Sequence, residues 1–433
     1  LGGLSLNSLM AANVVNGSVT AIVSGGRLAA AGDLDVHAAN DADIRALNKA
    51  TTQGTAAASL ALAFNAIGWK DQSLKAPTIS ALLGSGMGSE ATVFSKAAVH
   101  DATLSIAGDA TIDASSAGSI DARLGSASDG GFTGSAGFAL AMNRVSSGSN
   151  AWIGTATQAG AVTGRSKVLD IAVGGDLDVS AADETAIDAS VSLASAGGML
   201  AVGGSAVRND ARGRTAASID DARVATGGLL AVTSAESATI KAALDGTAKT
   251  DQGLPIVGGG LAVNGLIATN LVLAESSATV SDSDLKAAGN LLVDADNTAT
   301  ITADNTAALR SGGVAVGVLL AYNTVGWKAE DLFSQTIDTI IGEVGTAQPV
   351  TVNALVTQST LDIGGDAAIL ADVTATVTSN ISNEVSARSG AASASLVLAT
   401  NQVKSSADAK LSEAGRQTGA RRVFCLGDNF HDR

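Results

Sequence analysis

The residues in this sequence that could do chemistry are mostly carboxylates arranged in pairs. At five places two Asp residues stand two positions apart, and on a β-strand such a pair projects from one face. Carboxylates on one face could share a hard cation such as calcium. The tandem glycine–aspartate nonapeptide of calcium-binding repeats is absent, so the pattern favours a solvated acidic face. The pairs are Asp33/Asp35, Asp41/Asp43, Asp176/Asp178, Asp282/Asp284 and Asp294/Asp296.

Other catalytic side chains are scarce. His37, His100 and His431 are too few and too scattered for a catalytic or metal triad. The one cysteine, Cys425, lies near the end of the chain, and no phosphate-binding loop is present. We therefore predict no enzyme and, calcium aside, no cofactor. The alternative is a β-helix carbohydrate-active enzyme, a lyase or hydrolase, which clustered Asp/Glu and Arg in a groove on one coil would favour.

Charge limits the partners. The net charge of −15 and the pI of about 4.5 argue against nucleic acid and anionic membranes, which both attract clustered Lys and Arg. The uncharged stretch 254–274 approaches the roughly 20 residues of a membrane-spanning helix. Gly258, Gly259, Gly260 and Asn264 interrupt it, so we predict a buried strand and no membrane insertion of this segment.

The elements that position these residues repeat along the chain. An Asn follows each Ala-rich apolar run, and a branched aliphatic residue ends each Gly-led strand. Such periodicity is typical of stacked copies of one supersecondary unit. The asparagines are Asn13, Asn65, Asn143, Asn209, Asn270, Asn323 and Asn401. The aliphatic markers are Val36, Ile112, Val179, Val232, Val293 and Ile369, with a second set eight residues later at Ile44, Ile120, Ile187, Ile240, Ile301 and Val377.

The repeat has two levels. Small units of about 53–78 residues separate successive asparagines, and a large unit of 257–258 residues separates Asn13 from Asn270 and Asn65 from Asn323. Asn13 lies 23 residues before Val36, which we interpret as one solenoid turn, with a longer turn of about 30 residues to the next Asn. Stacked strands lie about 4.8 Å apart, so roughly 18 coils would form a rod on the order of 85 Å long.

Local patterns predict the strands of each unit. In 175–192 apolar and polar residues alternate, apart from Asp183 and Glu184, which we interpret as a turn. The fully apolar run 312–321 predicts a strand covered on both faces, or one lying under an added element. The Asn that closes each run either occupies an ordinary turn or hydrogen-bonds to its equivalents along the stack, and the spacing favours this ladder.

Two matching insertions break the spacing after Gly68-Trp69 and Gly326-Trp327. In the second, Phe333, Ile337, Ile340, Ile341 and Val344 recur at helical spacing. We predict a short amphipathic helix in each insertion, lying on the flank of the solenoid and anchored by Trp69 and Trp327. It is either a partner-binding protrusion or, as we favour, a packed cover for an apolar face.

The last residues depart from the repeat. Residues 1–413 read as solenoid, whereas 414–433 carry four Arg, the only Cys and one of the three His. We interpret this tail as frameshifted, artefactual or disordered, with a genuine short C-terminus as the alternative. Because the first residue is Leu, we expect the chain to be a piece of a longer protein.

The segments 175–189 and 312–327 resemble repeats of very large bacterial surface proteins. These are the filamentous-haemagglutinin-like and leukotoxin-type filamentous adhesins, and the passengers of autotransporters. The resemblance covers residues 1 to about 413 and implies an exported right-handed parallel β-helix at the cell surface, associated with the outer membrane. It also implies host-cell or matrix glycans or proteins, or neighbouring cells, as partners, but it transfers no ligand residues.

Together these observations predict an all-β fold, a right-handed parallel β-solenoid with two short helical insertions. We expect a structural or adhesive shaft segment of an extracellular adhesin.

Overall fold

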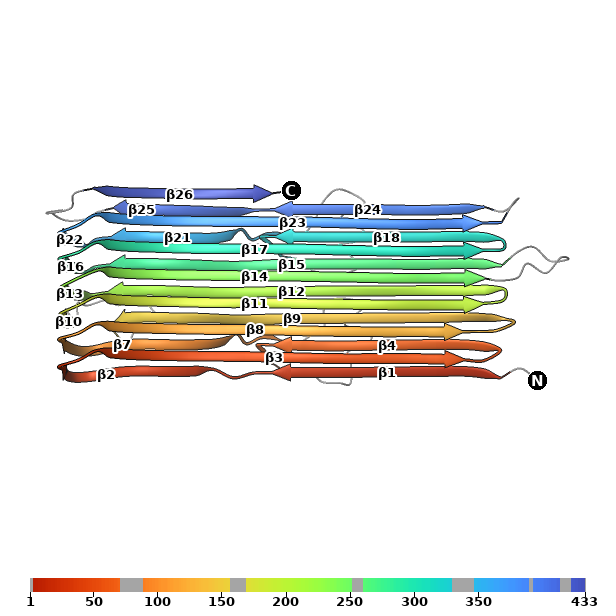
Figure 1. Ribbon diagram of the computed structural model, residues 1–433, viewed down its shortest axis with the longest axis horizontal. Coiled ribbons are helices and arrows are strands. Elements are labelled where there is room, and N and C mark those ends of the chain that lie inside the picture. Colours follow the sequence, from red (N-terminus) through yellow and green to blue (C-terminus); the bar gives the residue numbers. More distant parts are fainter. Residues whose placement is uncertain are drawn as a thin grey trace.

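The computed structural model is a stack of coils whose strands form two large parallel sheets (Figure 1). It describes residues 3–70, 89–155, 169–250, 260–328, 346–388, 392–412 and 422–432. These ranges contain strands and turns and no helix. The sequence prediction of an all-β solenoid of parallel strands is therefore confirmed.

Sheet B holds the long strand of each coil, and its seven members pair in register. Val36, Ile112 and Val179 occupy one column across it, and Ile44, Ile120 and Ile187 another. These columns point inward and are buried. The strands are β3 (Leu34–Gln53), β8 (Ala110–Asp129), β11 (Leu177–Gly197), β14 (Leu230–Thr250), β17 (Leu291–Ser311), β23 (Ala367–Ala387) and β26 (Val423–Asp432).

Sheet A contains fifteen strands, and these lead the chain from the end of one sheet B strand to the start of the next. Its long members are β1 (Leu4–Val15), β4 (Ala56–Ile67), β9 (Gly134–Gly154), β12 (Leu200–Asp220), β15 (Leu261–Ser281), β18 (Val314–Val325) and β24 (Ser393–Val403). Continuing strands are β2 (Val19–Ala30), β7 (Val93–Ile106), β21 (Val350–Thr357) and β25 (Ser405–Ser412). Short strands before the return to sheet B are β10 (Leu169–Val173), β13 (Ala222–Thr226), β16 (Asp284–Ala287) and β22 (Thr360–Ile363).

One coil is twice as long as the sequence spacing suggested. Leu177 pairs with Leu230, so a coil without an insertion takes 230 − 177 = 53 residues. The 23-residue interval from Asn13 to Val36 leads from sheet A to sheet B and covers only half a circuit. The prediction of roughly 18 coils in a rod of about 85 Å is therefore wrong. Seven strands at about 4.8 Å stack to about 30 Å, and a strand of 21 residues extends about 70 Å.

The predicted turn at Asp183 and Glu184 is also wrong. Both lie inside β11, which runs without interruption, and Asp183 points into the core. A buried acid is rare, so the sequence pattern favoured a turn. The alternative of an ordinary turn for the repeated Asn also fails, because Asn143, Asn209 and Asn270 lie in the middle of strands.

Sharp corners recur at one position of each coil. Asp101, Asp221, Asp282 and Gln358 have positive φ between 46° and 54°. Short polar residues tolerate this left-handed conformation better than bulky or β-branched ones. One bend per coil returns the chain from the long strand of sheet A towards sheet B.

A second corner depends on a glycine and an acid from adjacent coils. The backbone N–H of Leu229 donates to Asp176 Oδ1 at 2.7 Å, and that of Asp176 donates to Asp109 Oδ1 at 2.9 Å. A Cβ at Gly228 would lie 1.9 Å from Asp176 Oδ1. The glycine two residues before β8, β11 and β14, at Gly108, Gly175 and Gly228, therefore makes room for a carboxylate of the preceding coil.

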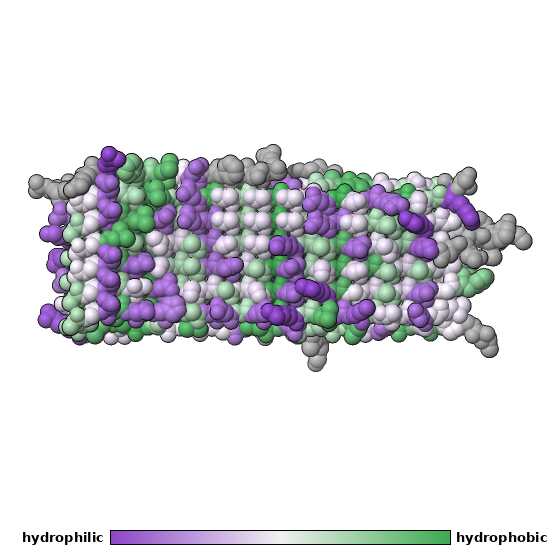
Figure 2. All heavy atoms as spheres, viewed as in Figure 1, coloured by the Kyte–Doolittle hydropathy of each residue, from purple (hydrophilic) through white to green (hydrophobic). Residues whose placement is uncertain are grey.

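The outer face of sheet A is partly apolar, whereas the outer face of sheet B is polar. Phe64, Met142, Leu320 and Tyr322 on the outer face of sheet A are buried. Figure 2 shows like side chains gathered in columns that cross the strands, as in-register stacking requires. The predicted coverage of both faces therefore holds only near the Asn of each run, since Leu320 is buried whereas Val314, earlier in the same run, is 41% exposed.

The insertions and part of the tail lie outside the described residues. The predicted helices, including Phe333 to Val344, fall within 71–88 and 329–345, which the structure does not describe. Their bases are two-residue antiparallel ribbons, β5 (Trp69–Lys70) with β6 (Ser89–Glu90), and β19 (Trp327–Lys328) with β20 (Thr346–Ala347). In the tail, β26 pairs in register with β23. Among the described residues, no helix has the length and hydropathy needed to span a membrane.

Candidate functional site

The seven repeated asparagines form one continuous ladder inside the stack. Asn13 Nδ2 donates to Asn65 Oδ1 at 2.8 Å, and each later side chain repeats this bond with the next coil at 2.7–3.0 Å. Asn65, Asn143 and Asn209 have no exposed surface. Because these inward amides satisfy one another, the ladder fixes the register of the coils.

The two tryptophans stand at the bases of the insertions. Trp69 is buried, and its backbone oxygen accepts a hydrogen bond of 2.8 Å from Asn16 Nδ2. The guanidinium carbons of Arg144 and Arg212 lie 4.6 and 5.0 Å from the centre of its ring system. Trp327 has a lysine at this position, with Lys404 Nζ 5.6 Å from the ring centre. Cation–π attraction thus ties each tryptophan to the neighbouring coils.

Charged side chains gather around Trp69 on the outer face of sheet A. Arg212 donates two hydrogen bonds of 2.9 Å to Asp210 and one of 2.5 Å to Glu90. Glu90 also accepts a hydrogen bond of 2.8 Å from Ser146 Oγ. The Nε atom of Arg144 lies 3.9 Å from Asp210. Bidentate pairing of this kind fixes the orientation of Arg212.

Burial and charge act together on these groups. Burial alone would raise the pKa of Asp210, but Arg212, with Arg144 and Arg208, holds it below its ordinary value. Burial lowers the pKa of Arg144 to about 10, against the opposing charge of Asp210. Asp210 therefore stays ionised and acts as the anchor of the cluster.

A pocket opens beside this cluster, which we call the notch. It has a volume of about 350 Å3. It lies between Glu90 and Thr92, which follow the first insertion, and Gln348, Pro349 and Thr351, which follow the second. Arg212, Arg214 and Glu275 come from the long strands β12 and β15. Arg214 Nε and Glu275 Oε2 are 3.3 Å apart, with side chains 66% and 46% exposed. The lining consists of Glu90, Thr92, Ser146, Ser147, Arg212, Gly213, Arg214, Leu273, Ala274, Glu275, Gln348, Pro349 and Thr351.

A buried pair of acids lies behind the notch, on the core side of sheet A. Asp183 and Glu236 are register partners on β11 and β14. Ser147 Oγ donates to Asp183 Oδ2 at 2.8 Å, and a Cβ at Gly213 would meet Glu236 Oε1 at 1.6 Å. Burial raises the pKa of Asp183 to about 7, and burial with the charge of Asp183 raises that of Glu236 well above its ordinary value. Both acids project from sheet B into the core, whereas Arg212 and Glu275 of the notch stand on the outer face of sheet A.

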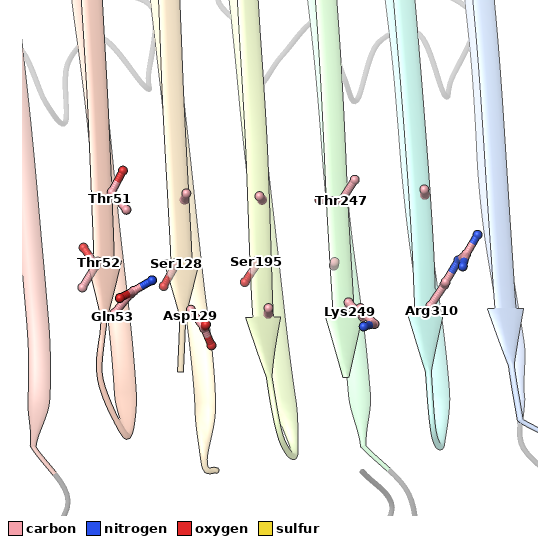
Figure 3. A pocket seen from close by; sticks show the side chains of 14 residues that line it. Thr51, Thr52, Gln53, Ser128, Asp129, Ser195, Thr247, Lys249 and Arg310 are labelled. Atoms are coloured by element: carbon pink, nitrogen blue, oxygen red, sulfur yellow. The ribbon is translucent and has the colours of Figure 1, made fainter. Parts of the chain in front are cut away.

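A shallow trough of about 560 Å3 crosses the outer face of sheet B near its strand ends (Figure 3). Gln53, Asp129, Lys249 and Arg310 project along it from β3, β8, β14 and β17. Its floor consists of alanines, among them Ala127, Ala194, Ala196 and Ala308. The charges of the trough come from separate strands, whereas the notch brings two arginines and two glutamates together as ion pairs.

One carboxylate in each of three acidic pairs named from the sequence accepts a hydrogen bond from another coil. Asp33, like Asp176, accepts a backbone N–H from the next coil, and Asp43 accepts from Ser119 Oγ at 2.6 Å. Asp282 occupies the left-handed corner. Burial and the charges of Asp296 and Asp372 raise the pKa of Asp294 to about 6. In the described part of the chain no group of three or more His, Cys, Asp or Glu is placed to hold a metal ion.

The remaining reactive residues are apart from the notch. His37 Nδ1 lies 2.8 Å from Asp113 Oδ2, and His100 Nδ1 lies 3.2 Å from Asp101 Oδ2. Cys425 is an exposed free thiol in β26, where His431 also lies. Sequence reasoning missed the notch, although one signal was present. Arg208, Asp210, Arg212 and Arg214 alternate along one strand, which places four charges on a single face.

Comparison with protein-family models, with curated proteins and with solved structures finds no match.

Proposed function

We propose that this chain is a shaft segment of a large exported bacterial surface adhesin, structural or itself adhesive. The observation that supports it most is the in-register stack with its continuous Asn ladder. Such a stack lengthens by adding coils without any change of fold, which suits a stiff spacer. The repeat resemblance of 175–189 and 312–327 supports the cell surface as its place and host-cell or matrix partners.

Labelling of intact cells tests this proposal. An antibody raised against the purified chain should stain unpermeabilised cells of the organism that encodes it. Beads coated with the chain should then be applied to host-cell layers and matrix proteins, where retention would assign adhesion to this segment itself. Staining that appears only after permeabilisation would exclude a surface shaft.

We also propose that the coils wind in the right-handed sense. The path from β11 to β14 joins two parallel strands of one sheet through sheet A, and such crossovers are right-handed in about 98% of cases. An experimentally phased crystal structure decides the hand directly.

The second candidate is a carbohydrate-active enzyme, because the notch brings Glu90, Glu275, Arg212 and Arg214 to one place. Each glutamate already faces an arginine, however, and a general acid needs a carboxyl that holds a proton. Incubation with neutral and acidic polysaccharides, followed by assays for new reducing ends and unsaturated sugars, tests it. Turnover that is lost in Glu275→Gln would favour the enzyme over the shaft.

A further inference from the structure

The notch offers hydrogen-bond donors and acceptors in equal measure. Arg212 and Arg214 supply donors, while Glu90 and Glu275 supply acceptors. Arg212 is held on two sides by Asp210 and Glu90, so it cannot swing away from the floor. Arg214 is 66% exposed and meets Glu275 through Nε, so its two terminal guanidinium nitrogens are not used in this ion pair.

This balance selects against most ligand classes. The two arginines and two glutamates carry no net charge, so neither a simple anion nor a simple cation gains net attraction from them. An apolar molecule would bury these charges without hydrogen bonds, at a large cost in free energy. A neutral polyol avoids this cost, because each hydroxyl can accept from a guanidinium and donate to a carboxylate.

We propose that the notch binds a neutral saccharide through the paired side chains of Arg214 and Glu275. Its volume of about 350 Å3 lies at the small end of the range for small-molecule sites and suits a short oligosaccharide. The pair presents donor and acceptor side by side, matching two adjacent ring hydroxyls. A shaft needs no ligand. Failure of saccharide binding would therefore leave the proposed shaft role intact, and failure of the shaft role would leave the saccharide site intact.

Saturation-transfer NMR and calorimetry on the intact chain test the site. The probes are disaccharides of glucose, galactose, mannose and N-acetylglucosamine, with oligogalacturonate and inorganic sulfate as anionic comparisons. At least one neutral disaccharide should bind, and Arg214→Ala and Glu275→Gln should each weaken it at least tenfold. Both side chains are substantially exposed, so circular dichroism should show an unchanged fold.

Two matched variants locate the ligand. Arg223 is 61% exposed and pairs with Asp170 far along the coil, so Arg223→Ala should leave saccharide binding unchanged. Arg310 is 64% exposed, pairs with Glu384 and lines the trough of sheet B, and Arg310→Ala should also be neutral. Loss of binding in Arg310→Ala would place the ligand in the trough instead. Binding of sulfate or oligogalacturonate alone, or of no probe, would overturn the inference, whatever the surface labelling shows.

Discussion

At the scale of single residues, Asp183 makes stability depend on pH in an unusual direction. Its folded pKa of about 7 lies above its ordinary value of 3.8, so the native state binds more protons between these values. Stability from this group is complete below about pH 4 and declines as the pH rises to about 7. We expect Asp183→Asn to raise the free energy of unfolding at pH 8 by about 2–4 kcal/mol.

Urea unfolding at pH 5 and pH 8 measures this effect. Asp183→Asn should gain less than half as much at pH 5 as at pH 8, whereas exposed Asp188→Asn in the same strand should change neither. Equal effects of Asp183→Asn at both pH values would show that burial does not raise the pKa of this carboxyl.

The Asn ladder predicts a gradient of mutational cost from its centre to its end. Asn209→Ala removes a link between two buried amides, leaving the Asn143 donor and the Asn270 acceptor unpaired. We expect a loss of about 2–4 kcal/mol. Asn13→Ala breaks one part-buried bond and should cost about 1 kcal/mol.

Denaturant titrations of both variants compare these costs. Equal losses would mean that the ladder contributes through side-chain volume and not through its hydrogen bonds.

Single-residue features divide into those that periodicity reveals and those that it hides. The seven Asn positions stood out because each coil repeats them. Asp183, Glu236 and Arg212 occur once each, so no repeat marked them, and their partners come from other coils. Ser147, which donates to Asp183, lies 36 residues before it, a distance that no local pattern covers.

At the scale of strands and corners, the Gly-Gly turn depends on close approach between coils. Gly228→Ala would place a Cβ 1.9 Å from Asp176 Oδ1 and push out the carboxylate that caps the Leu229 N–H. We expect a loss of about 1–3 kcal/mol. Gly265, on the outer face of β15, has open space around it, so Gly265→Ala should stay within about 0.5 kcal/mol of the wild type.

A double-mutant cycle checks the cause. Asp176→Ala combined with Gly228→Ala should cost less than the sum of the two single variants, because the first removes the atom that the second meets. Additive costs would mean that Gly228 serves some purpose other than admitting the carboxylate.

Strand identity could be predicted from alternation, but strand length could not. An acid at an inward position reads as a turn, although in β11 the alternation continues through Asp183 to Ile187. The neighbours that make this burial tolerable, Ser147 and Glu236, belong to other strands.

At the scale of the whole molecule, each coil is an exchangeable unit. Leu230 pairs with Leu291, so 291 − 230 = 61 residues make one complete circuit. Deleting 230–290 joins Leu229 to Leu291 and preserves the inward faces of both sheets. We expect a folded chain with unchanged far-UV circular dichroism and a stack shorter by about 4.8 Å in small-angle scattering.

The matched control deletes only 230–259, the part of that circuit on sheet B and the connection after it. This removes a strand from one sheet and leaves its counterpart in the other without a partner, so the chain should aggregate or lose β-structure. A folded product from this half-circuit deletion would contradict the two-sheet coil.

The repeat predicted the architecture of the stack but not its proportions. Each coil contains one Asn and a pair of aliphatic markers, and the sequence alone does not say whether the Asn and the markers lie in one sheet or in opposite sheets. Counting the 23-residue interval as a full turn made the molecule longer along the stack than along its strands. In the structure the strands run along the longest axis (Figure 1).

The seven amides of the ladder all point in one direction, each Nδ2 towards the Oδ1 of the next coil. Turning over one amide alone would set oxygen against oxygen on one side and nitrogen against nitrogen on the other. The amides can therefore invert only together. The stack accordingly has a head and a tail even where its coils look alike, and a further coil can be added only in the orientation of those already present.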